Sequence, residues 1–448
     1  MAESTLPPAQ APPEAGAQPA QEGRPAREGP PAREGRPARE GRPARGWLLR
    51  RRAFGLLVLG QTTSTFGDFL FIVAFPFLVL SGRSGVAGLG LALTLLGVAR
   101  LVGTPLGGVL ADRWHPRFTM IGADVARACV LLWLAATFAA GSPSLPQLCV
   151  VATALGLLEG LFLPAYRAIT PTILPPADLA RGNSVGEAFN VGAAIAGQLV
   201  AGAALTAFGA PTLLAIDITS FAVSALTLLA LTGRTAGKPV PQPAPEPVSE
   251  PAGSAGTFRT FLLSSRLLMV ILLMTAMVSI TAAGLFAVGL PVMAKQRFAA
   301  PAEVYGVLLF GIAVGRLAGS LAAGTLATAR WRGYKTLVLL AVHGALLVAL
   351  PSLHSLGLLL PALALLGFAD GTLLVIVLTV VQQLAPGEIR GRVMAAMTFV
   401  QTGSFPISVA LAGLAISQWG VNRTFLVGGV GVLLMALLGA GQRVVRDA

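Results

Sequence analysis

Long apolar segments separated by short polar ones fill the chain from residue 54 to residue 441. An α-helix needs about 20 apolar residues to cross the hydrocarbon core of a bilayer, and these segments have that length. The pattern therefore predicts an all-α membrane protein with twelve transmembrane helices. Their predicted limits are 54–80, 85–110, 119–140, 146–170, 185–208, 211–232, 267–293, 304–327, 336–353, 357–384, 393–416 and 423–441.

Polar, proline-rich segments divide the chain further. Residues 1–52 contain copies of the hexapeptide EGRPAR and no apolar run. We expect a disordered basic cytoplasmic tail there, either inert or weakly attracted to anionic lipid. Residues 233–258 are also proline-rich, which favours an extended cytoplasmic linker. This linker would separate an N-terminal six-helix half at 53–232 from a C-terminal half at 259–441, and residues 442–448 would form a second cytoplasmic tail.

The composition supports a membrane protein and explains its basic charge. Hydrophobic residues make up 54% of the chain and charged residues 11%, whereas soluble domains contain roughly a quarter charged residues. Lys and Arg concentrate in the cytoplasmic loops of membrane proteins. If both termini lie inside, 25 Lys and Arg fall in cytoplasmic segments and four in outer loops. The net charge of +13 thus predicts cytoplasmic termini and no nucleic-acid partner.

The sequence lacks two motifs that would indicate an enzyme, the nucleotide-binding GxxxxGKS/T and the zinc-binding HExxH. Its three histidines and two cysteines are too scattered for a metal site. We therefore expect no enzymatic activity, no metal and no other cofactor.

Two pairs of matching segments indicate an internal duplication. Residues 100–111 (RLVGTPLGGVLA) and 316–327 (RLAGSLAAGTLA) are identical at six of twelve positions, at an offset of 216 residues. Residues 156–163 (GLLEGLFL) and 367–374 (GFADGTLL) match at an offset of 211. Related halves are typical of transporters in which one half moves against the other. The repeats therefore predict two pseudo-symmetric halves.

Several stretches resemble one family of transporters. The loop GGVLADRWHPRFTM at 107–120 is similar to the signature Gly-x-Leu-Ala-Asp-Arg-x-Gly-Arg-Arg/Lys of the major facilitator superfamily. GQTTSTFGDF (60–69), ADVARA (123–128), IDITSF (216–221) and PGEIRGRV (386–393) resemble its macrolide-efflux and enterobactin-exporter branch. The resemblance implies a proton-coupled exporter of lipophilic small molecules in the bacterial inner (plasma) membrane, working by alternating access. It also implies that the first, fourth, seventh and tenth helices line a central cavity.

The signature loop is interpreted as a conformational latch made by Gly108, Asp112, Arg113 and Arg117. Gly108 would permit close helix contact, and Asp112 would accept charge-assisted hydrogen bonds at a neighbouring helix terminus. Such a contact can form in one conformation and break in another. The alternative interpretation is a plain basic loop without a conformational role.

Three acids within the predicted helices, Asp68, Glu159 and Asp370, are proton-coupling candidates. A charge at a helix centre costs roughly 2.5–3.5 kcal/mol or more, so each needs a reason. At about 1.5 Å per residue, these acids share one layer with Arg100 and Arg316. We predict the ion pairs Asp68–Arg100 and Arg316–Asp370. Burial favours a neutral carboxyl group and a nearby arginine favours a charged one, so separating a pair would drive proton uptake. The alternative is permanent pairs that lock helix packing.

Other charges within the helices are expected to be structural. Asp217 and the Asp124–Arg127 pair lie on the sixth and third predicted helices, which are usually peripheral in the resembled fold.

The chain is thus predicted to be a monomeric secondary transporter whose partners are a small molecule, protons and the lipid bilayer. Two alternatives stay open. One is a lipid or lysolipid flippase on the same fold. The other is a membrane-embedded enzyme, for which the sequence lacks a convergent nucleophile or metal set.

Overall fold

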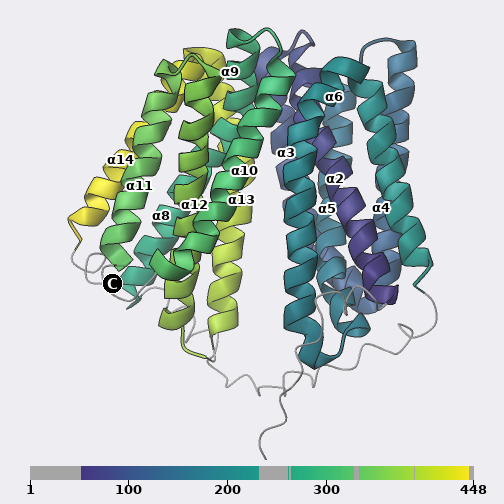
Figure 1. The fold of residues 1–448 in the computed structure, drawn as a ribbon, viewed down its shortest axis with the longest axis horizontal. Coiled ribbons are helices and arrows are strands. Elements are labelled where there is room, and N and C mark those ends of the chain that lie inside the picture. Colours follow the sequence, from purple (N-terminus) through teal and green to yellow (C-terminus); the bar gives the residue numbers. More distant parts are fainter. Residues whose placement is uncertain (1–51, 232–260, 262–263, 327–331, 388, 443–448) are drawn as a thin grey trace, which may run out of the picture. The chain divides into compact units, whose positions relative to one another are not determined.

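The computed structural model describes residues 52–231, 261, 264–326, 332–387 and 389–442, and within these ranges all regular structure is helical (Figure 1). The all-α prediction is confirmed for this part of the chain. The predicted linker at 233–258, the tail at 1–52 apart from its last residue, and the tail at 442–448 apart from its first lie outside the described residues.

The helices before the linker follow the predicted limits closely. Local signals fix several ends: His115 accepts a hydrogen bond from the Arg117 backbone N–H, and Pro116 occupies the first helical position. Ser144 forms a capping box with Gln147. These helices are α2 (Arg52–Leu80), α3 (Gly85–Arg113), α4 (Pro116–Ala140), α5 (Leu145–Ile173) and α6 (Leu179–Leu229), with a 3-10 turn at Pro176–Asp178.

The helices after the linker form a second set. The first of them, α8 (Arg266–Gly284), continues through a π-helical turn, η2 (Leu285–Gly289), into α9 (Leu290–Arg297). The others are α10 (Pro301–Leu326), α11 (Arg332–Ala349), α12 (Leu356–Leu384), α13 (Arg390–Trp419) and α14 (Val421–Ala440), with a 3-10 turn at Leu350–Ser352. Across the described residues, eleven helical stretches are long and apolar enough to cross a membrane.

Helix α6 covers both the fifth and the sixth predicted helix. It runs for 51 residues and is interrupted at Gly209, whose φ of 75° and ψ of 169° are not helical. A side chain would strain this left-handed backbone, so glycine suits the position. Gly420, between α13 and α14, has nearly the same conformation, with φ 81° and ψ 161°. The two glycines are 211 residues apart, the offset of the second sequence repeat.

Glycines bring α3 and α5 into backbone contact. A methyl group on Gly103 would lie 2.4 Å from the carbonyl oxygen of Leu157, and one on Gly160 would lie 2.5 Å from that of Arg100. No side chain fits at such distances, so small residues are required where these helices cross.

The same contacts recur between α10 and α12. A methyl group on Gly319 would lie 2.1 Å from the carbonyl oxygen of Phe368, and one on Gly371 would lie 2.2 Å from that of Arg316. Gly319 corresponds to Gly103 of α3 at the offset of 216 residues, and Gly371 corresponds to Gly160 of α5 at the offset of 211 residues. The internal repeat therefore encodes two equivalent helix pairs.

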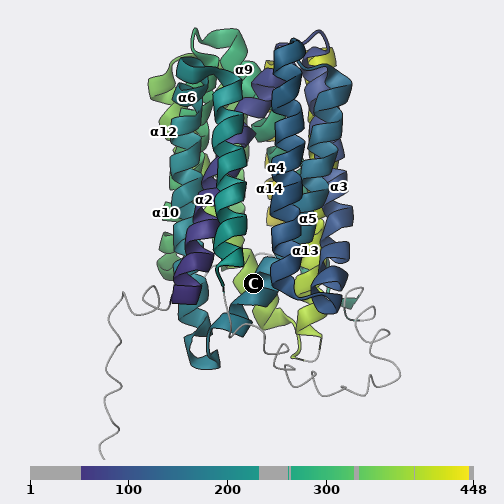
Figure 2. The same cartoon turned by 90° about the vertical axis from the view of Figure 1, so that its right-hand side faces the viewer.

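Two seams connect the helices before the linker with those after it. α3 packs on α13, where a methyl group on Gly90 would lie 2.8 Å from the Gly413 Cα, and α6 packs on α10 (Figures 1 and 2). In the second seam, a methyl group on Gly202 would lie 2.3 Å from the Ala302 carbonyl oxygen. Glycines thus line both seams.

Candidate functional site

Two ion pairs occupy equivalent places in the repeated helix pairs. Arg100 Nη2 lies 3.3 Å from Glu159 Oε1, and Arg316 Nη2 lies 3.0 Å from Asp370 Oδ2. The Glu159 side chain is 43% exposed and that of Arg316 is 54% exposed, so these pairs border open space and are not sealed in a core. The structure therefore contains the predicted Arg316–Asp370 pair.

The predicted Asp68–Arg100 pair is wrong. Arg100 pairs with Glu159, and Asp68 Oδ2 lies 3.8 Å from Arg127 Nη1. Depth along a helix places charges in one layer but does not fix their direction around the helix axis. Because Gly160 holds α5 against the backbone of Arg100, the nearest acid to Arg100 is on α5.

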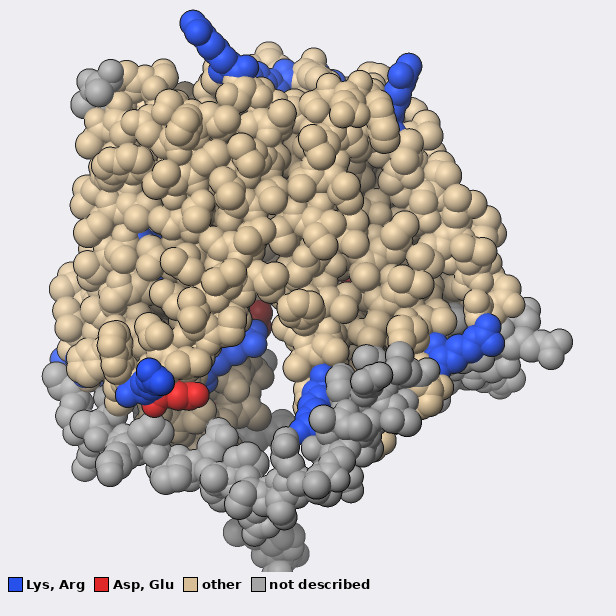
Figure 3. Space-filling view, turned by 180° about the vertical axis from the view of Figure 1, so that it is seen from behind, with Lys and Arg blue, Asp and Glu red and all other residues tan. Residues whose placement is uncertain are grey.

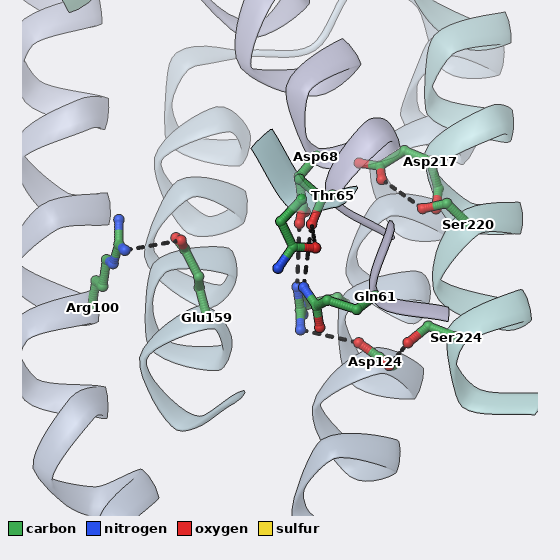
Figure 4. A network of polar contacts seen from close by, with 11 residues as sticks. Gln61, Thr65, Asp68, Arg100, Asp124, Glu159, Asp217, Ser220 and Ser224 are labelled. Atoms are coloured by element: carbon green, nitrogen blue, oxygen red, sulfur yellow. Dashed lines mark hydrogen bonds and ion pairs between the residues drawn. The ribbon is translucent and has the colours of Figure 1, made fainter. Parts of the chain in front are cut away.

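Arg127 on α4 is buried beside Asp68, Asp124 and Asp217, and we call these four residues the Arg127 cluster. Figure 4 shows its three carboxyl groups. Only 3% of Arg127 is exposed. Its guanidinium carbon lies 4.5 Å from the ring centroid of Phe162 and 4.7 Å from that of Phe221. Its Nη2 donates to Asp124 Oδ1 at 3.0 Å, and its Nη1 faces Asp68. Two aromatic faces and two carboxylates thus replace the water that this cation would otherwise bind.

Side chains of α6 complete the Arg127 cluster. Ser224 Oγ donates to Asp124 Oδ2 at 2.7 Å, and Ser220 Oγ lies 3.2 Å from Asp217 Oδ1. The helices α4 and α6 thus bring Asp124, Arg127 and Asp217 beside the coupling candidate Asp68 of α2, a neighbourhood not predicted from the sequence. Helical spacing was the missed signal: Asp217, Ser220 and Ser224 are three and four residues apart and share one face.

A cavity of about 440 Å³ lies among the helices after the linker and contains the Arg316–Asp370 pair. Its wall is largely apolar, with a few polar groups such as Thr275, Ser279 and Gln401. Figure 3 shows the molecule hollowed at its lower end, with acidic and basic side chains at the inner edge of the hollow. Within the described residues no group of three His, Cys, Asp or Glu side chains could hold a metal ion.

The predicted latch residues do not act together in this conformation. Space around Gly108 is open, so its predicted role in close helix contact is wrong, and the contact falls on Gly107. Asp112 and Arg113 are exposed, and neither forms an ion pair with the described residues. Arg117 instead donates to the carbonyl oxygens of Leu229 and Leu231 at the end of α6. It thereby caps that helix terminus, where a cation is favourable.

At the end of the bundle opposite the hollow, two basic side chains of α9 donate hydrogen bonds to neighbouring helices. Lys295 Nζ donates to the carbonyl oxygen of Leu80 at the end of α2, a contact that joins the two helix sets. Arg297 donates to the carbonyl oxygens of Pro351 and Leu353 and to Asn422 Oδ1. At this end, which we call the closed end, the Lys295 hydrogen bond joins the two helix sets, whereas the other end is hollow.

Apolar helices long enough to span a bilayer, repeated helix pairs and charged pairs beside a cavity define a multi-pass membrane protein of the transporter class. The chain belongs to the Major Facilitator Superfamily, whose family model matches residues 57–409. The relatives and solved structures found for it are transporters.

Relatives and solved structures cover most of the chain. The multidrug efflux pump Tap of Mycolicibacterium fortuitum is 27% identical over 398 residues, which is 86% of this chain and 94% of the relative. The pump of the same name from Mycobacterium tuberculosis (strain ATCC 25618 / H37Rv) is 28% identical, over 83% of this chain and 88% of the relative. The fold is similar to that of the nucleoside transporter NupG, with a TM-score of 0.69 and 13% identity, covering 87% of this chain and 98% of NupG.

Proposed function

We propose that this protein is a proton-coupled exporter of lipophilic small molecules that works by alternating access in the bacterial inner membrane. The observation that carries the proposal is the pair of part-exposed ion pairs, Arg100–Glu159 and Arg316–Asp370, at equivalent positions of two repeated helix pairs. A carboxylate that is both paired and open to a cavity can exchange a proton when the pair separates. Export as the direction is supported by the multidrug efflux pumps that this chain resembles.

The proposal includes twelve membrane crossings in two halves, at 53–232 and 259–441. In it, α6 crosses twice, because Gly209 breaks the helix at the place equivalent to the Gly420 junction between α13 and α14. The concentration of Lys and Arg supports cytoplasmic termini. The hollow end would then face the cytoplasm, and we infer an inward-facing conformation in which the Asp112 latch is released.

Lipophilic substrates suit the cavity lining. Met274, Met397, Phe286 and Phe405 present flexible and aromatic apolar surface, and the Arg316–Asp370 pair supplies charge at one place. Apolar walls with a few polar groups are typical of small-molecule sites, and methionine adapts to ligands of different shape. We propose that the substrate binds in this cavity, that the transporter is a monomer, and that no metal or organic cofactor takes part.

Transport in everted membrane vesicles tests the proposed function. An imposed pH gradient is expected to drive accumulation of a fluorescent lipophilic cation. We expect at least one of three variants to lose that accumulation: Asp68→Asn, Glu159→Gln or Asp370→Asn. Glu187→Gln, an exposed acid on α6 outside the cluster, is the matched control. If all three variants accumulate substrate like the parent protein, the coupling assignment is wrong. Asymmetric lipid accumulation in reconstituted vesicles would favour the flippase alternative.

Removal of the Lys295 contact is expected to shift the balance of conformations. Lys295→Met deletes the hydrogen bond to Leu80 that holds the closed end together, and such a bond contributes about 0.5–1.5 kcal/mol. The fraction of molecules open at that end should rise severalfold. Spin labels on α2 and α9 would report the change as a longer distance in pulsed EPR. Arg423→Met, at the start of α14, is the control, and an equal shift in both variants would contradict a specific role for Lys295.

A further inference from the structure

The Arg127 cluster contains three carboxyl groups and one guanidinium. Asp68, Asp124 and Asp217 come from three different helices, and Arg127 is the cation that the described residues place among them. If all four groups were ionised, the cluster would carry a net charge of minus two. Asp124 is 0% exposed and Asp217 is 1% exposed. Buried charge that is not compensated costs several kcal/mol, so the cluster must hold at least one proton.

Asp124 and Asp68 are suited to the ionised state. Asp124 accepts from Arg127 Nη2 at 3.0 Å and from Ser224 Oγ at 2.7 Å, so both of its oxygens have a strong donor. The Asp68 side chain is 36% exposed and faces Arg127 Nη1 at 3.8 Å, so water and the guanidinium can both stabilise its charge.

Asp217 is not suited to the ionised state. Ser220 Oγ donates to the Asp217 backbone oxygen at 2.8 Å, and its contact with the carboxyl Oδ1 is longer, at 3.2 Å. No described cation forms an ion pair with Asp217. An ionised carboxylate offers about four acceptor positions, and one shared hydroxyl leaves most of them empty. The proton of the cluster is therefore best placed on Asp217.

The Asp217 carboxyl group lies against the backbone of α2. A methyl group on Gly67 would lie 2.4 Å from Asp217 Oδ1, and Gly67 immediately precedes Asp68. The two carboxyl groups interact electrostatically. Figure 4 shows Asp217 on the α6 side and Asp68 on α2. A buried acid is thus next to a part-exposed one, which is the arrangement needed to pass a proton between an interior site and the solvent.

We propose that Asp217 is a second proton-carrying residue of the transport cycle, holding a proton in this conformation and delivering it through Asp68. This inference rests on the proposed proton coupling. In the transfer, the Asp217 O–H bond breaks and its proton binds the Asp68 carboxylate, so the cluster still holds one proton. Arg127, no longer facing a charged Asp68, then compensates the Asp217 anion. Asp68 releases its proton to water as Asp217 takes up another from water, which restores the starting charge. The charged groups that act on Asp217 are Asp68 from α2 and Arg127 from α4.

Infrared spectroscopy of the purified full-length protein tests whether Asp217 holds a proton. A carbonyl-stretch band of a protonated carboxyl group is expected near neutral pH, lost in Asp217→Asn and retained in Asp124→Asn. Ser220→Ala, which removes only the hydroxyl contact, should shift the frequency of that band without deleting it, and it serves where Asp217→Asn folds poorly. A band that persists in Asp217→Asn and does not move in Ser220→Ala overturns the inference.

Transport assays test whether the proton moves. Asp217→Asn, which fixes a neutral side chain of the same shape, is expected to lose accumulation driven by a pH gradient while it keeps downhill exchange of substrate. A merely structural Asp217 would leave the response to the gradient unchanged, and that result would overturn the inference. If the parent protein itself ignores the gradient, the proposed coupling fails and the transfer step with it. The infrared band would then still decide whether Asp217 is protonated.

Discussion

Replacement of Arg127 by methionine is expected to lower the free energy of unfolding by about 3–5 kcal/mol, the typical effect of leaving a buried charge without its partner. Arg127 is 3% exposed and is the cation that contacts Asp124, which has no exposed surface. Methionine fills similar space between the rings of Phe162 and Phe221 but carries no charge. Chemical or thermal unfolding of the purified protein in detergent would measure the loss.

Companion variants separate charge from packing. The double variant Arg127→Met/Asp124→Asn removes both partners and is expected to recover most of the lost stability, because paired removal of buried charges is often nearly neutral. Arg100→Met, which breaks a part-exposed pair, should cost less than about 1 kcal/mol. Equal losses for Arg127→Met and Arg100→Met would contradict the central role of Arg127.

Replacement of Gly107 by alanine is expected to destabilise the protein by about 1–3 kcal/mol, as overpacking of a close contact typically does. The new methyl group would lie 2.6 Å from the carbonyl oxygen and 2.7 Å from the Cα of Leu161. Both atoms are backbone, so α3 and α5 would have to separate. The midpoint of thermal unfolding would report the change.

The adjacent residue provides a matched control. Gly108→Ala meets no atom within 4 Å. In a helix, alanine is favoured over glycine by roughly 0.5–1 kcal/mol, so this variant should be as stable as the parent protein or slightly more stable. A larger loss of stability in Gly108→Ala than in Gly107→Ala would show that the close contact belongs to the signature glycine after all.

The sequence predicted the helices well because length and hydropathy decide which segments can enter a bilayer. The incorrect predictions concern which way a side chain points around its helix axis, and therefore which residue it contacts. The offsets of 216 and 211 residues relate Arg100 to Arg316 and Glu159 to Asp370, so the predicted Arg316–Asp370 pair already implied Arg100–Glu159. Internal symmetry, applied to both repeats together, would have found that pair.

The Arg127 cluster was harder to predict. The i,i+3 spacing of Asp124 and Arg127 shows that they share a face of α4, but not which helix covers that face. That depends on α2 and α6 lying side by side, which close contacts such as Gly67 on Asp217 make possible. A glycine next to an acid in one helix gives no sequence signal that another helix will approach there.

The single-residue junction at Gly209 has a consequence for how the protein enters the membrane. On the twelve-crossing proposal, no charged or extended polar segment separates the two helical stretches that this glycine joins. The insertion machinery therefore has no hydrophilic loop to hold between them, and the charges that flank the second stretch come only after it, beginning at Arg234. We therefore expect the two stretches to enter the membrane together as one hairpin. The Gly420 junction differs, because the charged Arg423 follows it by three residues.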